Sequence, residues 1–256
     1  MSLLQEVLLF ATTFLAGLLN ATVGGGGLLQ VPMLMILLPG TPIATLLGTA
    51  KLAGLPGLVG ASATFARRLE PAWPLVLRAG AAEIPAAFLG ARLATRLDPA
   101  LARPILLVLL AAMSAHVLLQ PRFGQHTGER PLRTRGPTPW LIGASIGLYE
   151  GFLGSGSGSI LIVLFVLVSG LDLVGASVAS TMVTLAGVVA AVATFAAAGA
   201  MLPFLAAKMM LFNLAGSLIG ARLVTLRENR LLKRMLAVML LLLLTRLSWD
   251  VFRGAS

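Results

Sequence analysis

Two glycine-rich stretches inside long apolar runs constrain the fold of this chain most strongly. Residues 17–27 read GLLNATVGGGG, and residues 147–158 read GLYEGFLGSGSG. Glycine has no side chain, so the backbone there can leave a helix and approach another group closely. Inside a bilayer, such a break is tolerated only where protein or a water-filled cavity receives the freed amide groups. The two stretches are therefore expected to form the two halves of one buried binding site.

Composition sets the class of the protein. Hydrophobic residues make up 58% of the 256 residues and charged residues 11%, and the mean hydropathy is +0.97. A soluble domain of this length could not hide so much apolar surface. We therefore expect an all-α, polytopic protein of the cell inner membrane. Residues 1–23 have no basic start before their apolar run and are interpreted as the first membrane helix, not as a cleaved signal.

The ionisable residues exclude several other classes of function. The arginines behind the net charge of +10 fall in short gaps between apolar runs. There they are expected to set topology and contact anionic lipid, not nucleic acid. With two histidines and no cysteine in the chain, no metal site can be assembled, and no cofactor is expected.

The apolar runs form two sets of five. About 20 apolar residues are needed to span a bilayer, so the second run of each set is too short and is expected to be one arm of a glycine-broken hairpin. This predicts a first membrane repeat at 1–119, a basic cytoplasmic linker at 120–138 and a second repeat at 139–256. Each repeat would hold the broken hairpin and three transmembrane helices. The runs are 3–23, 28–38, 42–66, 74–95 and 100–119, then 139–153, 159–169, 171–198, 203–225 and 229–249.

The two sets are related by a shift of 130 positions that needs no gap. The shift places glycines on glycines in both broken stretches and residues 90–93, GARL, on residues 220–223, also GARL. One unbroken register over most of a half indicates an internal duplication. If each broken hairpin enters and leaves on one side, the copies are inverted, and most Lys/Arg clusters share the cytoplasmic side. Both termini would then lie outside; parallel copies are the alternative, and they fit the Lys/Arg distribution less well.

Inverted repeats whose interrupted helices meet near the membrane midplane are how many secondary transporters build a site for alternating access. The free amides and positive ends of half-helices favour an anion. We therefore predict a small anionic substrate. The predicted substrate-binding residues are Asn20, Gly24, Gly25, Gly26, Gly27, Lys51, Gly154, Ser155, Gly156, Ser157, Gly158, Ser180 and Thr181.

A few charged residues inside the apolar runs are candidates for coupling and gating. Lys51 lies too deep in run 42–66 for its ammonium to reach the interface easily, and an intramembrane charge is by default a functional hypothesis. It is expected to face the anion, with a structural pairing to Glu83 or Glu150 as the alternative. Those two carboxyl groups are the proton-coupling candidates. Arg92 and its counterpart Arg222 could gate the substrate path or simply extend to the interface.

The Gly-x6-Gly-x-Gly signature near the start of each half resembles the TauE/SafE family of sulfite and organosulfonate exporters, as do the length, the duplication and the basic central loop. The resemblance covers nearly the whole chain. In that family a proline often follows the glycine cluster; Pro32 fits, whereas Val163 stands in the equivalent area of the second half. The resemblance implies export of small sulfur-containing or related organic anions, such as sulfite or sulfoacetate, across the inner membrane.

A membrane-embedded enzyme and an anion channel are the two alternatives to a transporter. A membrane-embedded enzyme acting on phosphorylated lipid precursors would need a nucleophile or base, and only Ser155, Ser157 and Glu150 are available near the breaks. An anion channel would share the site but lack coupling. We expect a transporter and not an enzyme, with membrane lipids as further partners and a homodimer as a possible assembly.

Overall fold

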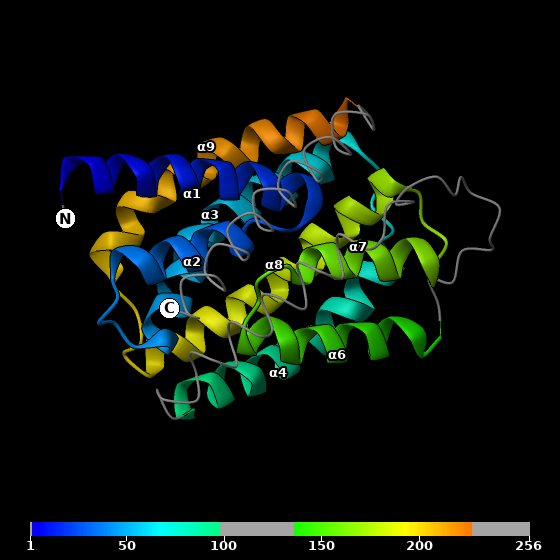
Figure 1. Ribbon diagram of the computed structural model, residues 1–256. Coiled ribbons are helices and arrows are strands. Elements are labelled where there is room, and N and C mark those ends of the chain that lie inside the picture. Colours follow the sequence, from blue (N-terminus) through cyan, green and yellow to red (C-terminus); the bar gives the residue numbers. More distant parts are fainter. Residues whose placement is uncertain (1, 98–135, 227–256) are drawn as a thin grey trace, which may run out of the picture.

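The chain is entirely helical wherever its structure is described. A computed structural model describes residues 2–97 and 136–226 (Figure 1), and all regular secondary structure in these ranges is α-helix. The predicted all-α fold is confirmed. The predicted runs 100–119 and 229–249, and most of the linker 120–138, lie outside the described residues. The helices are α1 (Leu3–Val23), α2 (Gly27–Leu37), α3 (Ile43–Arg68), α4 (Trp73–Arg96), α6 (Thr138–Phe152), α7 (Ser157–Leu167), α8 (Leu173–Ala197) and α9 (Pro203–Thr225).

The helices of the second half follow those of the first at a constant offset. Helices α2 and α7 have 11 residues each and begin 130 positions apart. The same offset separates the starts of α3 and α8, and of α4 and α9. The register that the sequence predicted therefore extends to the starts of these three helix pairs. Pro32 lies inside α2, and α7 contains no proline, so the missing proline leaves the length of the short helix unchanged.

Five helices, α1, α3, α4, α8 and α9, are long and apolar enough to cross a membrane. Helices α2 and α7 are too short to cross, as predicted. Helix α6 has 15 residues, whereas its equivalent α1 has 21. The difference lies at its start, where Pro137 precedes the helix and Pro139 occupies the first turn, a position that tolerates the missing N–H of proline.

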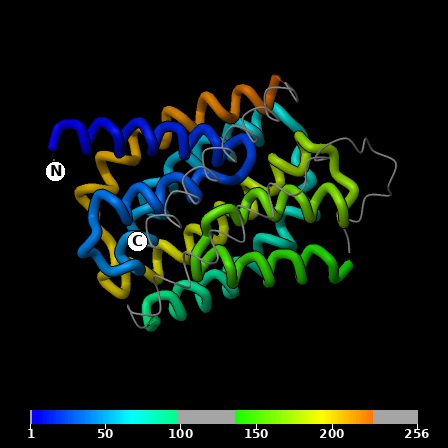
Figure 2. Tube along the Cα trace, in the orientation of Figure 1, coloured from blue at the N-terminus to red at the C-terminus, as the bar shows by residue number. Residues whose placement is uncertain are grey.

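Helices from the two halves pack against each other in matched pairs. Helix α1 packs on α9, and its equivalent α6 packs on α4; α3 packs on α9, and its equivalent α8 packs on α4. Helices α3 and α8 also contact each other, and in Figure 2 they lie in the interior of the bundle, among the other helices. Exchanging the halves therefore converts each of these pairs into another pair of the same set, which is the property of a pseudo-twofold arrangement.

The two central helices run in opposite directions. The start of α3 lies at the end of α8, where the hydroxyl of Thr49 accepts a hydrogen bond of 3.0 Å from the backbone N–H of Leu202. The start of α8 lies at the end of α3, where Arg67 and Arg68 share one hollow with Asp172. These two equivalent helices are thus antiparallel. Inversion of the two copies across a membrane stays a prediction.

Small residues let the outer helix pairs approach closely. A Cβ atom added to Gly151 of α6 would lie 2.7 Å from the backbone carbon of Ala87 in α4. On the equivalent pair, a Cβ added to Gly216 of α9 would lie 2.9 Å from the backbone carbon of Phe14 in α1. Helices in membranes gain packing through such small residues, because lipid provides no hydrophobic force between them.

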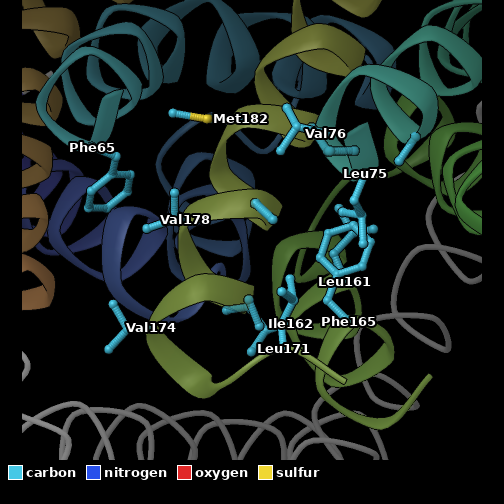
Figure 3. Close-up of a cluster of buried hydrophobic side chains, with 14 of the residues drawn as sticks. Phe65, Leu75, Val76, Leu161, Ile162, Phe165, Leu171, Val174, Val178 and Met182 are labelled. Atoms are coloured by element: carbon cyan, nitrogen blue, oxygen red, sulfur yellow. The ribbon is translucent and has the colours of Figure 1, made fainter. Parts of the chain in front are cut away.

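Large apolar side chains hold the short helix α7 in place. Leu161 and Phe165 of α7 are fully buried, and they share one hydrophobic cluster with Leu75 of α4 (Figure 3). Phe65 of α3 belongs to the same cluster and is fully buried, as is its equivalent Phe195 of α8 in the other cluster. This packing fixes where the glycine break before α7 lies.

Candidate functional site

Each glycine stretch separates two helices, as the sequence predicted. The first break lies between Val23, the last residue of α1, and Gly27, the first of α2. The second lies between Phe152 and Ser157, which end α6 and begin α7. The equivalent residues Gly24 and Gly154 both adopt left-handed backbone, with φ of 72° and 75°. A side chain there would cost about 1–2 kcal/mol, which explains why both breaks need glycine at this point.

The two breaks are in direct contact. The hydroxyl of Ser159 in α7 donates a 2.7 Å hydrogen bond to the carbonyl oxygen of Val23, and that of Ser155 donates a 3.3 Å bond to the carbonyl of Gly27. A Cβ added to Gly24 would lie 2.6 Å from the Cα of Gly158. Segments about 130 residues apart in the sequence therefore form one unit.

Hydroxyl groups of α8 support this unit from one side. Ser177 donates a 2.7 Å hydrogen bond to the carbonyl of Thr22, and Ser180 donates a 2.8 Å bond to the carbonyl of Gly158. Thr181 donates within its own helix, to the carbonyl of Ser177. The carbonyl of Thr22 is in the last turn of α1, where carbonyl groups have no intrahelical partner, and the Ser177 hydroxyl supplies one. In this conformation Ser180 and Thr181 thus serve the backbone; their contact with a substrate stays a prediction.

A cavity of about 50 Å³ lies between the breaks and the two central helices. Four pairs of its lining residues are related by the 130-residue offset: Asn20 and Glu150, Gly27 and Ser157, Gly54 and Thr184, Leu58 and Val188. The first residues of both short helices are in this set, so both helix N-termini face the cavity. The complete lining is Asn20, Gly27, Gln30, Val31, Leu47, Ala50, Lys51, Gly54, Leu58, Glu150, Leu153, Gly154, Ser155, Ser157, Thr184 and Val188.

A buried ion pair joins the two halves at this cavity. The Nζ atom of Lys51 in α3 lies 2.5 Å from both Oε1 and the backbone carbonyl oxygen of Glu150 in α6. The other carboxylate oxygen of Glu150 accepts a hydrogen bond from the hydroxyl of Ser157. Lys51 is 8% exposed and Glu150 is 2% exposed. This pairing is the structural alternative foreseen for Lys51, and it places its ammonium group at the cavity wall.

Two polar side chains in the lining have a fully buried donor atom without a hydrogen-bond partner in the described part of the chain. They are Gln30 in α2, through Nε2, and Thr184 in α8, through Oγ1. Neither was among the predicted site residues. Gln30 was detectable, because it is the one polar side chain in the apolar run 28–38. Thr184 had no such signal, because hydroxyl residues are common in membrane helices.

Glu83 and Asn213 occupy equivalent positions on α4 and α9, and neither lines the cavity. Both are at most 1% exposed, and neither Glu83 carboxylate oxygen nor Asn213 Oδ1 has a partner among the described residues. Each is enclosed by glycines of two neighbouring helices. A Cβ on Gly147 would lie 2.8 Å from the Cα of Glu83, and one on Gly187 would lie 2.9 Å from its carboxyl carbon. A charged, unpaired carboxylate here would be very costly.

The predicted residues thus divide into two groups. Seven line the cavity: Asn20, Gly27, Lys51, Glu150, Gly154, Ser155 and Ser157. The others do not: Gly24, Gly25, Gly26 and Gly156 belong to the breaks, Gly158 is in the first turn of α7, Ser180 and Thr181 bond backbone, Glu83 is enclosed separately, and Arg92 and Arg222 are exposed near helix ends.

A second hollow of about 540 Å³ lies where α3 ends and α8 begins. Arg67, Arg68, Glu70 and Asp172 line it, and it shares no lining residue with the cavity between the breaks. Its mixed charges leave it without a strong preference for one sign of ligand.

The family model described as "Sulfite exporter TauE/SafE" matches residues 9–247. The chain belongs to the TauE/SafE family. The described residues include five helices long and apolar enough to cross a bilayer, so this is a multi-pass membrane protein. The family resemblance predicted from the sequence is confirmed. No solved structure matches the chain.

Its relatives carry names of the same kind. The chain is 29% identical to a "Probable membrane transporter protein" of Haemophilus influenzae, over 95% of this chain and 94% of the relative. It is 31% identical to "Probable membrane transporter protein ORF9" of a Sinorhizobium species, over 94% and 92%. It is 27% identical to "Probable membrane transporter protein YfcA" of Escherichia coli K12, over 94% and 89%. This TauE/SafE member therefore belongs to the general class of membrane transporters.

Proposed function

We propose that this TauE/SafE protein is a secondary transporter that exports small sulfur-containing or related organic anions, such as sulfite or sulfoacetate, across the inner membrane by alternating access. The observation that carries the proposal is the cavity on which both glycine breaks converge, with Gly27 and Ser157 as the first residues of two short helices. The description of the matching family supports the class of substrate.

The chemistry of the cavity favours a negative solute. The first amides of a helix have no intrahelical partner, and the helix macrodipole places about half a positive charge at this end. Two such ends meet at the cavity, beside the ammonium group of Lys51. Within a membrane these groups would replace the hydration shell of an anion. The small volume, about 50 Å³, restricts the site to a small anion or to the head group of a larger one.

The ion pair offers a way to couple anion binding to a proton. The ammonium group of Lys51 is balanced by the carboxylate of Glu150. Protonation of Glu150 would remove this balance and leave Lys51 positive beside the cavity, which strengthens the attraction for an anion. Proton and anion would then bind together and leave together. Glu83 is the second candidate, since it is buried without a partner among the described residues.

The arrangement of the halves supports the proposal of alternating access. The antiparallel course of α3 and α8 and the matched packing pairs support an inverted repeat, in which the two states of a transporter exchange the roles of its halves. Arg67 and Arg68 at the end of α3 then mark the cytoplasmic side, by the excess of basic residues there. Both chain termini would lie on the opposite side.

The test is counterflow in liposomes. Purified protein is reconstituted in vesicles loaded with unlabelled anion, and accumulation of labelled sulfite is followed in the presence of sulfoacetate, taurine, thiosulfate or acetate outside. We expect transient accumulation of sulfite above equilibrium and competition by sulfoacetate. Passive equilibration without counterflow would identify a channel, turnover of an added lipid phosphate would identify an enzyme, and inactivity towards the whole panel would refute the proposed substrates.

A further inference from the structure

Two neutral hydrogen-bond donors in the cavity lining are fully buried and make no hydrogen bond within the described residues. Gln30 of α2 is 4% exposed, Thr184 of α8 is 6% exposed, and Gln30 Nε2 and Thr184 Oγ1 have no partner within the described residues. A buried polar atom without a partner costs roughly 1–3 kcal/mol. Two such atoms in the lining of one cavity therefore indicate a ligand that accepts hydrogen bonds from both.

The conformation of Thr184 differs from that of other threonines in the same helix. The hydroxyls of Thr181 and Thr194 donate to the carbonyls four residues earlier, those of Ser177 and Ala190, which is the usual local bond of a threonine in a membrane helix. Thr184 makes no such bond and lines the cavity. Its hydroxyl is thus available to a ligand at the cost of a bond that its own helix could have supplied.

Gln30 and Thr184 also break the symmetry of the two halves. Their counterparts at the 130-residue offset are Ile160 and Gly54, neither of which has a side-chain donor. The backbone contributions of the two helix ends are shared equally between the halves, whereas these side chains are not. A side chain that only one half carries is not needed to build the repeat. Its presence at the cavity is therefore better explained by a contact with the ligand.

The size of the cavity limits what these donors can hold. A site needs roughly 10–15 Å³ in this measure for each water molecule, so about 50 Å³ accommodates only a handful of heavy atoms. A polyatomic oxyanion offers several acceptor oxygens within that space. A long organic tail would have to remain outside it.

We propose that the Gln30 amide and the Thr184 hydroxyl donate hydrogen bonds to oxygen atoms of the transported anion. Through these bonds the two residues select substrates that carry a compact oxyanion head group. This inference rests on the proposed transport function and names the residues that recognise the substrate. Because both donors are neutral, they contribute whether or not Lys51 is paired with Glu150, and they select for acceptor geometry and not for charge alone.

The experiment compares Gln30→Leu and Thr184→Val with Thr194→Val in sulfite counterflow. The first two changes keep the approximate shape and remove the donors; the control removes a hydroxyl from the same helix, away from the cavity. A hydrogen bond to a charged group implies a rise in the Michaelis constant of about ten- to a hundred-fold for each cavity variant. The control should retain the wild-type constant, and chloride should compete poorly with sulfite in the wild type.

Thermal stability separates recognition from a structural role. An unpartnered buried polar atom destabilises the ligand-free protein, so Gln30→Leu and Thr184→Val should melt at or above the wild-type temperature without anion. They should lose the stabilisation that sulfite gives the wild type. A lower melting temperature without anion, or unchanged sulfite constants in both variants, would overturn the inference. Absence of sulfite counterflow in the wild type would instead refute the proposed function.

Discussion

Removing the ammonium group of Lys51 should destabilise the protein far more than removing an exposed one. In Lys51→Met, Glu150 would keep its buried carboxylate and lose the charged donor 2.5 Å from Oε1; only the Ser157 hydroxyl would remain. The ammonium group makes two hydrogen bonds, and bonds to charged groups contribute about 1.5–3 kcal/mol each. Breaking a buried ion pair from one side costs about 3–5 kcal/mol, which agrees with that sum.

The chain supplies its own control for this experiment. Lys208 of α9 lies 3.8 Å from Glu6 of α1, with side chains that are 61% and 38% exposed. Exposed pairs contribute about 0.2–1 kcal/mol, so Lys208→Met should change the free energy of unfolding by no more than that. For both variants, the free energy of unfolding is measured by adding dodecyl sulfate to the protein in detergent micelles and following the loss of helix.

A double variant decides whether the effect comes from the unpaired charge. In Lys51→Met with Glu150→Gln no charge remains at the site, so most of the lost stability should return, even though transport should not. If Lys51→Met were as stable as the wild type, the pair would not be a buried ion pair. If the double variant were no more stable than the single one, the cost would lie in packing and not in the carboxylate.

Three further changes test the breaks, the coupling and the cavity. In Gly154→Ala, the new side chain must adopt left-handed backbone, which costs about 1–2 kcal/mol, and its Cβ would overlap the Lys51 ammonium group. The rate of counterflow should therefore fall by about tenfold or more. The control Gly40→Ala, whose Cβ would meet no atom within 4 Å, should leave the rate unchanged. Glu83→Gln should retain sulfite counterflow but lose uptake driven by a pH gradient, if Glu83 carries the coupled proton; equal loss in both assays would contradict this. A cysteine at Gly54, where a Cβ meets nothing within 4 Å, should react with a small charged thiol reagent more slowly in the presence of sulfoacetate, and the cysteine-free wild type provides the blank; a rate independent of sulfoacetate would place the anion elsewhere.

Much of the fold could be predicted because its signals are local or repeat along the chain. Apolar runs, glycine breaks and the 130-residue register are all visible without knowing which helices touch. The depth of Lys51 in its run was equally visible. Its partner was not, since Glu83 and Glu150 were both available and only the packing of α6 against the rest decides between them. The shorter length of α6 relative to α1 was visible as well, because the predicted run 139–153 begins at Pro139, in the first turn of the helix.

The polar residues of the site show where prediction from the sequence stops. Ser180 and Thr181, which were expected to face the substrate, bond backbone in this conformation, and their contact with a substrate stays a prediction. Thr184, one turn further along α8, lines the cavity. Neighbouring hydroxyl residues on a helix point in different directions, about 100° apart per residue. Which of them reaches a cavity depends on how the helix is rotated against its neighbours, and no local pattern encodes that rotation.

Taken alone, the sequence determined that this chain is a duplicated, helical membrane protein with two broken helices, because hydrophobic length, glycine and repetition act through the backbone near each residue. Only the tertiary structure decided that the breaks touch, that Lys51 pairs with Glu150, and that Gln30 and Thr184 keep free donors at one cavity. Those outcomes depend on contacts between segments more than a hundred residues apart, where burial leaves each polar group either with a partner or without one.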